Sequence, residues 1–412
     1  MGGFAPGAFQ IMVPAGQSLR FTPELRATLF HFTVFLSTGA SSVYLGIWLM
    51  GKGITPDQIG VINALPVLVL MGINYFIGRL ADKAEDWRQV IIILSLLAGA
   101  LPIGLFFVND FWGILLVWTL LFVPAGSLPP ITDAATVRMT QRNGSDFGTI
   151  RAWGTVGSII ATAATGLLVA WFGGDFFVPF FVFVSALRAL MSLQLPKFRA
   201  PAREATLATV EPRAGKLREV LKPWFVLPLL AFALINTTHS ILGAFATLVW
   251  LDHGISPDIL GPLMATAGVA EALLMFGWRR IGGRISARQM LMAAAIVVVF
   301  RWTVMAFNPP VEVLFALQVL HAVTFGMGYF GMVHFIANWT SEEIAAEAQG
   351  FSFVLQQAFA VVGLVTMGWL VSLYGSWAFL LSAGCGIAAA IFLLISLRLQ
   401  PVRPHAALET LT

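Results

Sequence analysis

Charged side chains are scarce in this sequence. Only 11% of the 412 residues are Asp, Glu, Lys or Arg, whereas 58% are hydrophobic. A water-soluble domain carries about 25% charged residues and needs them to cover its surface. Lipid must therefore surround most of this surface, and we expect an all-α membrane protein that crosses the bilayer many times.

Cysteine and the motifs of catalysis are also nearly absent. The one cysteine, Cys385, lies in an apolar run, so no internal disulfide can form. The sequence has no Walker loop, dinucleotide fingerprint, zinc-ligand spacing or nucleophile elbow. An enzyme or an ATP-driven pump is not expected, and neither are catalytic residues, a cofactor or a bound metal. The net charge of +4 does not indicate a nucleic-acid partner, because basic residues also hold cytoplasmic loops in place.

Long apolar runs fill most of the chain. A helix needs about 20 apolar residues to cross the hydrocarbon core. Runs of this length, separated by Gly, Pro and charged residues, predict twelve transmembrane helices. They are expected near residues 25–50, 57–79, 88–109, 111–139, 147–172, 176–196, 222–251, 258–279, 287–307, 310–337, 344–373 and 376–399.

The basic residues between these runs predict the orientation. With a cytoplasmic N-terminus, the segments facing inward hold 20 Lys or Arg residues, and those facing outward hold only Lys52. Such an asymmetry follows the positive-inside rule. We therefore expect a multi-pass protein of a bacterial-type inner (plasma) membrane, with both termini in the cytoplasm. The inward set is Arg20, Arg26, Arg79, Lys83, Arg88, Arg138, Arg142, Lys197, Arg199, Arg203, Arg213, Lys216, Arg218, Lys222, Arg279, Arg280, Arg284, Arg288, Arg398 and Arg403.

The chain divides near its middle into two similar halves. One long polar stretch predicts a cytoplasmic linker at 197–221 between a six-helix bundle at 1–196 and another at 222–412. The octapeptide 53–60, GITPDQIG, returns 201 residues later as GISPDILG at 254–261. Helix-capping preferences explain these residue types, but they do not explain their equivalent positions. The repeat predicts two bundles related by a pseudo-two-fold axis along the membrane normal, a known plan of transporters.

The loop after the second predicted helix carries a short motif, GRLADK at 78–83. It resembles the cytoplasmic signature of the major facilitator superfamily, in which a glycine is followed by Leu-Ala-Asp and a basic residue. The basic residues that normally follow are partly replaced here. The resemblance implies a cytoplasmic gate motif that includes Gly78, Asp82 and Lys83.

A second motif lies in the fifth predicted helix. FGTIRAWGTVG at 147–157 is similar to a pattern of the branch that holds lactose permease, the nucleoside–proton symporters and the phenylpropionate permeases. Ala348-Gln349-Gly350 looks like the matching element of the phenylpropionate type. The resemblance covers nearly the whole chain and implies the major facilitator fold.

Ionisable residues inside the predicted helices indicate the site, because each costs a few kcal/mol at the bilayer centre unless it is paired or hydrated. Asp133 and Arg151 flank the short loop between the fourth and fifth helices at similar depth, within pairing reach. The resemblance implies that such a pair contacts substrate. A structural ion pair that joins the two helices is the alternative.

The second half supplies Glu271, Arg301 and His321 on successive helices. Helical hairpins would bring all three to mid-membrane, so one buried network is expected. The resemblance implies proton coupling and substrate binding by these residues, although a static network is the alternative. Lactose permease has its proton-carrying Glu three residues after the helix-10 His, where this chain has Thr324. We therefore name Glu271, then His321, then Asp133 as proton-coupling candidates.

The candidate polar contacts for a substrate are His239, Arg151, Arg301 and Asp133. Trp153 is a candidate for stacking on a flat ring of the substrate. His239 stands beside Asn236, Thr237 and Thr238, and the sequence fits a cavity-lining histidine as well as a structural one.

Together these features predict a secondary active transporter that moves a small organic solute by alternating access with protons. It would be a monomer in the lipid bilayer. Aromatic acids, nucleosides and sugars are the candidate solutes. Arg151 and Arg301 could accept a carboxylate, which together with the resemblance to the phenylpropionate type favours an aromatic acid, although the same residues can bind sugar or nucleoside hydroxyls. A proton-coupled efflux antiporter is one alternative. A transporter-like sensor without flux is another.

Overall fold

The computed structural model describes residues 21–198, 221–281, 285–340 and 342–399, which are helical and contain no strand. The segments in order are α1 (Pro23–Gly51), α2 (Pro56–Lys83), α3 (Trp87–Ala100), η1 (Leu101–Phe106), α4 (Phe111–Asn143), α5 (Phe147–Phe172), η2 (Gly174–Phe176), α6 (Phe177–Ser192), α8 (Pro223–Asp252), α9 (Pro257–Ile281), α10 (Ala287–Ala306), α11 (Val311–Val319), η5 (Ala322–Met327), α12 (Gly328–Trp339), α13 (Glu342–Tyr374), η6 (Gly375–Phe379) and α14 (Leu380–Leu399).

These segments supply the predicted membrane crossings. By length and composition, ten helical runs of the described residues can cross a membrane, or eleven if the bent helix α1 counts as one. One of the runs, Glu347–Leu399, has 53 residues and includes both α13 and α14. At 1.5 Å per residue it is far longer than a bilayer core of about 30 Å, so it accounts for two crossings. The twelve predicted helices are confirmed in kind and order.

The repeated octapeptide forms the same corner twice. Gly53 and Gly254 both have left-handed backbone, with φ of 75° and 81°. Glycine adopts this conformation without steric cost, which ends α1 and α8 sharply. Pro56 and Pro257 then begin α2 and α9, where proline is favoured because its missing N–H would have no helical partner.

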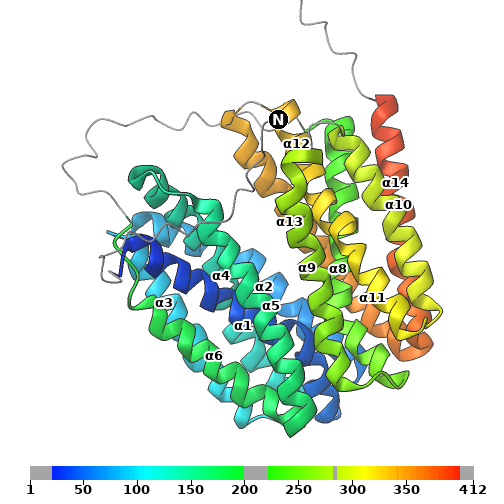
Figure 1. Cartoon of the computed structure of the whole chain (residues 1–412), viewed down its shortest axis with the longest axis horizontal. Helices are drawn as coiled ribbons and strands as arrows, with labels where there is room; N and C mark the ends of the chain where they lie inside the picture. Colours follow the sequence, from blue (N-terminus) through cyan, green and yellow to red (C-terminus); the bar gives the residue numbers. More distant parts are fainter. Residues whose placement is uncertain (1–20, 199–220, 282–284, 341, 400–412) are drawn as a thin grey trace, which may run out of the picture.

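The helices form two groups that lie side by side (Figure 1). In the first group α1 packs on α5 and α6, and α2 packs on α4. In the second, α8 and α10 pack on α14, and α13 packs on α8. Between the groups, α2 contacts α13, α5 contacts α9 and α1 contacts α8.

We name the two ends of the molecule by their turns. The α1–α2 end holds residues 52–55 and 253–256, and the α2–α3 end holds residues 84–86 and 144–146. Figure 1 shows the two groups close together at the α1–α2 end and farther apart at the other.

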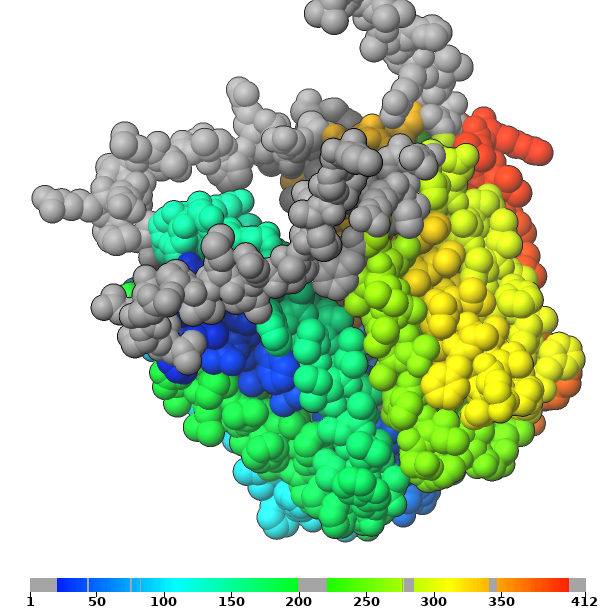
Figure 2. Space-filling model, viewed as in Figure 1, coloured from blue at the N-terminus to red at the C-terminus, as the bar shows by residue number. Residues whose placement is uncertain are grey.

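Glycines allow the close approach at the α1–α2 end. A Cβ on Gly60 of α2 would lie 2.7 Å from the carbonyl oxygen of Leu364, and a Cβ on Gly368 of α13 would lie 2.6 Å from that of Pro56. Midway along these helices, Gly268 of α9 packs on the side chain of Ile159 of α5, with 3.2 Å from a built Cβ to that side chain. Figure 2 shows α5 and α9 in contact along this face. The α1–α2 end is therefore closed by backbone-to-backbone packing.

Candidate functional site

The predicted helix at 310–337 is not one regular helix. It consists of α11, the π-helical segment η5 and α12. A Cβ on Gly326 would lie 2.9 Å from Leu274 of α9, so the glycine lets η5 approach that helix. Short π-helical segments are often found at functional sites, because they turn side chains away from their regular positions. His321 directly precedes η5.

A carboxylate and an imidazole meet between α9 and this broken helix. Glu271 Oε2 lies 3.2 Å from His321 Nε2, and the two side chains are 19% and 14% exposed. Nδ1 of His321 is buried without a hydrogen-bond partner. Arg151 is on α5, the helix of the other group that packs against α9, which carries Glu271. The Glu271–His321 pair can bind one more proton, and it lies on the side of its helix group where α9 packs on α5.

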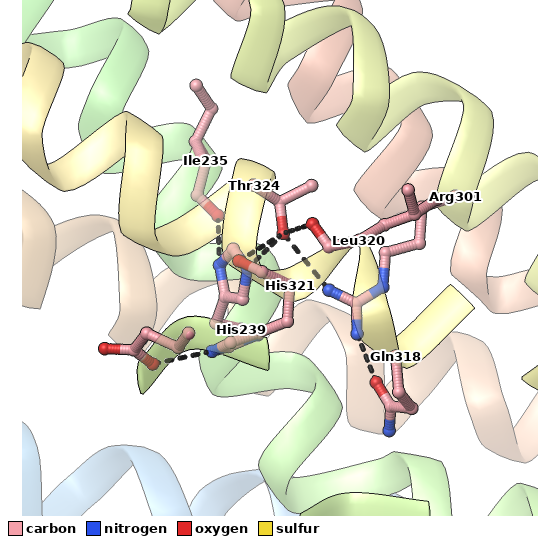
Figure 3. Close-up of polar contacts among 8 residues, drawn as sticks. Ile235, His239, Arg301, Gln318, Leu320, His321 and Thr324 are labelled. Carbon is pink, nitrogen blue, oxygen red and sulfur yellow. Dashed lines mark hydrogen bonds and ion pairs between the residues drawn. The ribbon is translucent and has the colours of Figure 1, made fainter. Parts of the chain in front are cut away.

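Thr324 joins three helices through its hydroxyl (Figure 3). Nε2 of His239, on α8, lies 2.9 Å from Thr324 Oγ1, and the Arg301 guanidinium of α10 donates to the same oxygen at 3.2 Å. Nδ1 of His239 lies 3.0 Å from the carbonyl oxygen of Ile235. The His239 and His321 rings meet edge to face, with their centroids 4.9 Å apart.

Arg301 is completely buried. Its guanidinium donates to the side-chain oxygen of Gln318 as well as to Thr324. Among the described residues no carboxylate lies within ion-pair distance of it. Glu271 and His321 thus form one pair, and Arg301 is linked to it only through Thr324, His239 and the ring contact of His239 with His321. The predicted roles of these three residues stay predictions.

The first group of helices has its own polar cluster. Arg151 Nε lies 3.6 Å from Asp133 Oδ1, and His31 Nδ1 of α1 lies 3.7 Å from the same oxygen. Nε2 of His31 is 3.1 Å from the Thr136 hydroxyl. Asp133 and Arg151 are about one-third exposed, whereas His31 is buried. The predicted pairing of Asp133 with Arg151 is present, and its role stays a prediction.

A cavity of about 420 Å³ lies between the two groups of helices. Its walls carry hydroxyl, amide and imidazole groups and three aromatic rings, and none of the lining side chains is Asp, Glu, Lys or Arg. His239 lines this cavity and also belongs to the Thr324 network, so it connects the two. The polar and aromatic lining consists of Thr38, Ser41, Ser42, Asn63, Trp118, Phe122, Asn236, His239, Ser240, Phe325 and Gln357.

The other predicted residues lie outside these clusters. Trp153 is 49% exposed, and its position two residues after Arg151 places it on a different face of α5. Gly78 and Lys83 lie near the end of α2, where a Cβ on Gly78 would meet open space and Lys83 is exposed. The side chain of Asp82 is outside the described residues, so the predicted gate contact stays a prediction.

Sequence reasoning did not select His31 or Gln318. His31 had a visible signal, since it is a histidine inside the first apolar run. Gln318 had none, because an uncharged residue in an apolar run has no marked sequence signature.

Paired ionisable groups inside a bundle of membrane-crossing helices, beside a cavity between two helix groups, define a membrane transporter of small solutes. The family described as the MFS_1 like family matches residues 25–380. This chain therefore belongs to the major facilitator superfamily, whose members are transporters and not enzymes.

Several known proteins are similar to it along most of their length. The probable 3-phenylpropionic acid transporter of Escherichia coli (strain K12) is 27% identical over 347 residues, which cover 81% of this chain and 89% of that protein. The maltose permease of Geobacillus stearothermophilus is 24% identical over 352 residues, covering 85% and 86%.

Among solved structures, the nucleoside transporter NupG superposes with a TM-score of 0.78 at 17% identity. That match covers 92% of this chain and 100% of the NupG chain. This likeness shows the fold, which is the expected all-α architecture of twelve membrane helices.

Proposed function

We propose that this protein is a proton-coupled symporter that carries a small organic solute into the cell across a bacterial-type inner membrane. Two six-helix bundles, residues 1–196 and 222–412, would rock about the cavity, joined by a linker at 197–221. The positive-inside pattern of the sequence supports a cytoplasmic location for the α2–α3 end and for both termini. The closed α1–α2 end then faces outward, so the described conformation is closed to the outside.

The Glu271–His321 pair is the observation that carries proton coupling. A carboxylate and an imidazole 3.2 Å apart can hold one added proton between them. Because both groups are mostly shielded and lie next to a cavity, that proton can change how solute binds there. Asp133, which lies between His31 and Arg151, is the second place where a proton could be held.

The cavity lining supports a particular solute chemistry. The hydroxyls of Thr38, Ser41 and Ser42 donate to backbone carbonyls of their own helix, so they offer lone pairs to the cavity. A carboxylate only accepts hydrogen bonds and has no lining cation to pair with. Aromatic rings and amide groups suit a neutral ring with hydroxyl or N–H donors. Among the three predicted classes, nucleosides and sugars fit this lining better than an aromatic acid.

Arg151 and Arg301 have different proposed roles. Arg151 is one-third exposed, so it can reach a solute when it exchanges Asp133 for another partner. Arg301 is buried and its two terminal nitrogens donate to Thr324 and Gln318, so we propose that it positions those groups.

Uptake into proteoliposomes tests this function. The purified protein is first screened by thermal shift against 3-phenylpropionate, uridine and maltose, and the stabilising compound is then used as a radiolabelled solute. An inward acid gradient is expected to accelerate uptake of that solute by the wild-type protein. Glu271→Gln is expected to abolish the acceleration, because the amide cannot take up a proton.

Glu312→Gln is the matched control. Glu312 is exposed in the first turn of α11, so its variant should respond to the gradient as the wild type does. If the rate of wild-type uptake does not depend on the pH gradient, the protein is a uniporter. Accumulation only with the gradient reversed would make it an efflux antiporter. Binding without counterflow would indicate a sensor.

A further inference from the structure

His239 is placed so that it can change its protonation without losing a hydrogen bond. Nδ1 faces the carbonyl oxygen of Ile235 at 3.0 Å. A carbonyl only accepts, so Nδ1 carries a hydrogen in either protonation state. Nε2 is therefore the nitrogen that gains or loses the proton, and it faces the Thr324 hydroxyl at 2.9 Å.

The Thr324 hydroxyl can reverse its role toward this nitrogen. With neutral His239, the hydroxyl donates to Nε2. With protonated His239, the Nε2–H donates to Oγ1, and the hydroxyl turns to the carbonyl oxygen of Leu320 at 3.2 Å. Arg301 donates to Oγ1 at 3.2 Å in both cases. Each state leaves every polar atom of this contact paired, which a buried group that changes charge requires.

The charged neighbours determine when His239 can hold a proton. His321 faces it edge to face, and Arg301 approaches through Thr324. Arg301 is always charged and opposes a positive charge on His239, and His321 opposes it as well once His321 is protonated. Glu271 pairs with His321 Nε2, and Arg151 is carried by α5, which packs on the Glu271 helix α9 across the boundary between the helix groups. One proton can thus be held on the Glu271–His321 pair or on His239, but two protons would repel each other.

We propose that His239 is the residue that couples protonation of the Glu271–His321 pair to the substrate cavity. Its ring contact with His321 transmits the charge of the pair, and a hydroxyl relay at Thr324 keeps Nε2 hydrogen-bonded in either protonation state. In this step a hydronium ion brought in by symport breaks one O–H bond and leaves as water, one N–H bond forms at Nε2, and the Thr324 O–H turns from Nε2 to the Leu320 carbonyl oxygen. Its ring lines the cavity, while both of its nitrogens are engaged by protein groups. His239 accordingly acts as a positioning residue, and not through a nitrogen bound to solute. This proposal rests on the proposed proton symport.

Nitrogen NMR on ¹⁵N-histidine-labelled full-length protein tests the hydrogen bond itself. The chain has six histidines, and the His239 signals are identified by their loss in His239→Gln. The expected result at neutral pH is an Nδ1–H tautomer whose Nε2 shift changes in Thr324→Val and stays in Thr324→Ser. An Nε2–H tautomer, or an Nε2 shift that is the same in both variants, would overturn the relay.

Transport then tests the coupling, with uridine, 3-phenylpropionate and maltose as probes. Thr324→Val is expected to lose the acceleration by an inward acid gradient while solute counterflow continues, and Thr324→Ser is expected to restore the acceleration. If Thr324→Val responds to the gradient as the wild type does, the relay is wrong although symport stands. If the wild type itself does not respond, the proposed function fails, and the NMR result still decides whether the hydrogen bond exists.

Discussion

Replacing Gly368 with alanine is expected to open the α1–α2 end. The new Cβ would lie 2.6 Å from the Pro56 carbonyl oxygen and 3.1 Å from Gly60 Cα, both of them backbone atoms that cannot rotate away. Relief requires α13 to move away from α2. Overpacking of this kind costs about 1–3 kcal/mol. Only the closed arrangement bears the cost, so the population should shift toward the open one by about 5- to 150-fold.

Distances between spin labels across this end measure the shift. Labels on cysteines at Asp175 and Glu312, both exposed and in different helix groups, would report it in a Cys385→Ala background. The wild type is expected to show a main short distance, and Gly368→Ala a main longer one.

Gly384→Ala is the matched control, since a Cβ at that helical position meets no atom within 4 Å. It should leave the distances unchanged. If Gly368→Ala also leaves them unchanged, glycine packing does not hold this end closed, and the reasoning is refuted.

Two further predictions concern stability. Gln318→Leu leaves the buried Arg301 guanidinium without one acceptor and is expected to destabilise the protein by about 1.5–3 kcal/mol. The measurement is the Tm, which should be lower than that of the control Gln357→Leu, in which the replaced residue lies on the cavity wall. Thr149, through its hydroxyl and amide, and Gly148, through its amide, donate to Asp146 and lower the pKa of its carboxyl. When folding lowers the pKa of a carboxyl, the ionised group stabilises the fold at pH values above its unfolded-state pKa of about 4, and this stabilisation is lost as the pH falls through its folded-state pKa. The Tm difference between wild type and Asp146→Ala should therefore be largest near neutral pH and shrink in acid.

Much of the fold was predictable from the sequence, because lipid imposes one strong constraint. Every crossing must be an apolar helix of sufficient length, so apolar runs and loop charges were enough to give the order of the helices. The turns at 53–60 and 254–261 depend on local residues, a glycine that ends one helix and a proline that begins the next, so the repeated octapeptide was enough to predict two equivalent turns.

The site was predictable only where helical depth decides proximity. Counting residues from a loop placed Asp133 beside Arg151 and His321 near Glu271. It could not show that Arg301 reaches Thr324, since that contact depends on the π-helical turn of η5. The closure between α2 and α13 also depends on the tertiary arrangement, because an isolated glycine in an apolar run does not reveal which helix it meets.

Proton movement driven by solute tests the central claim most directly. Proteoliposomes with a trapped pH-sensitive dye and equal pH on both sides receive an inward gradient of the solute selected by thermal shift. The account predicts internal acidification with the wild type and with Glu312→Gln, and none with Glu271→Gln. Solute entry without acidification by the wild type, or equal acidification by Glu271→Gln, would contradict it.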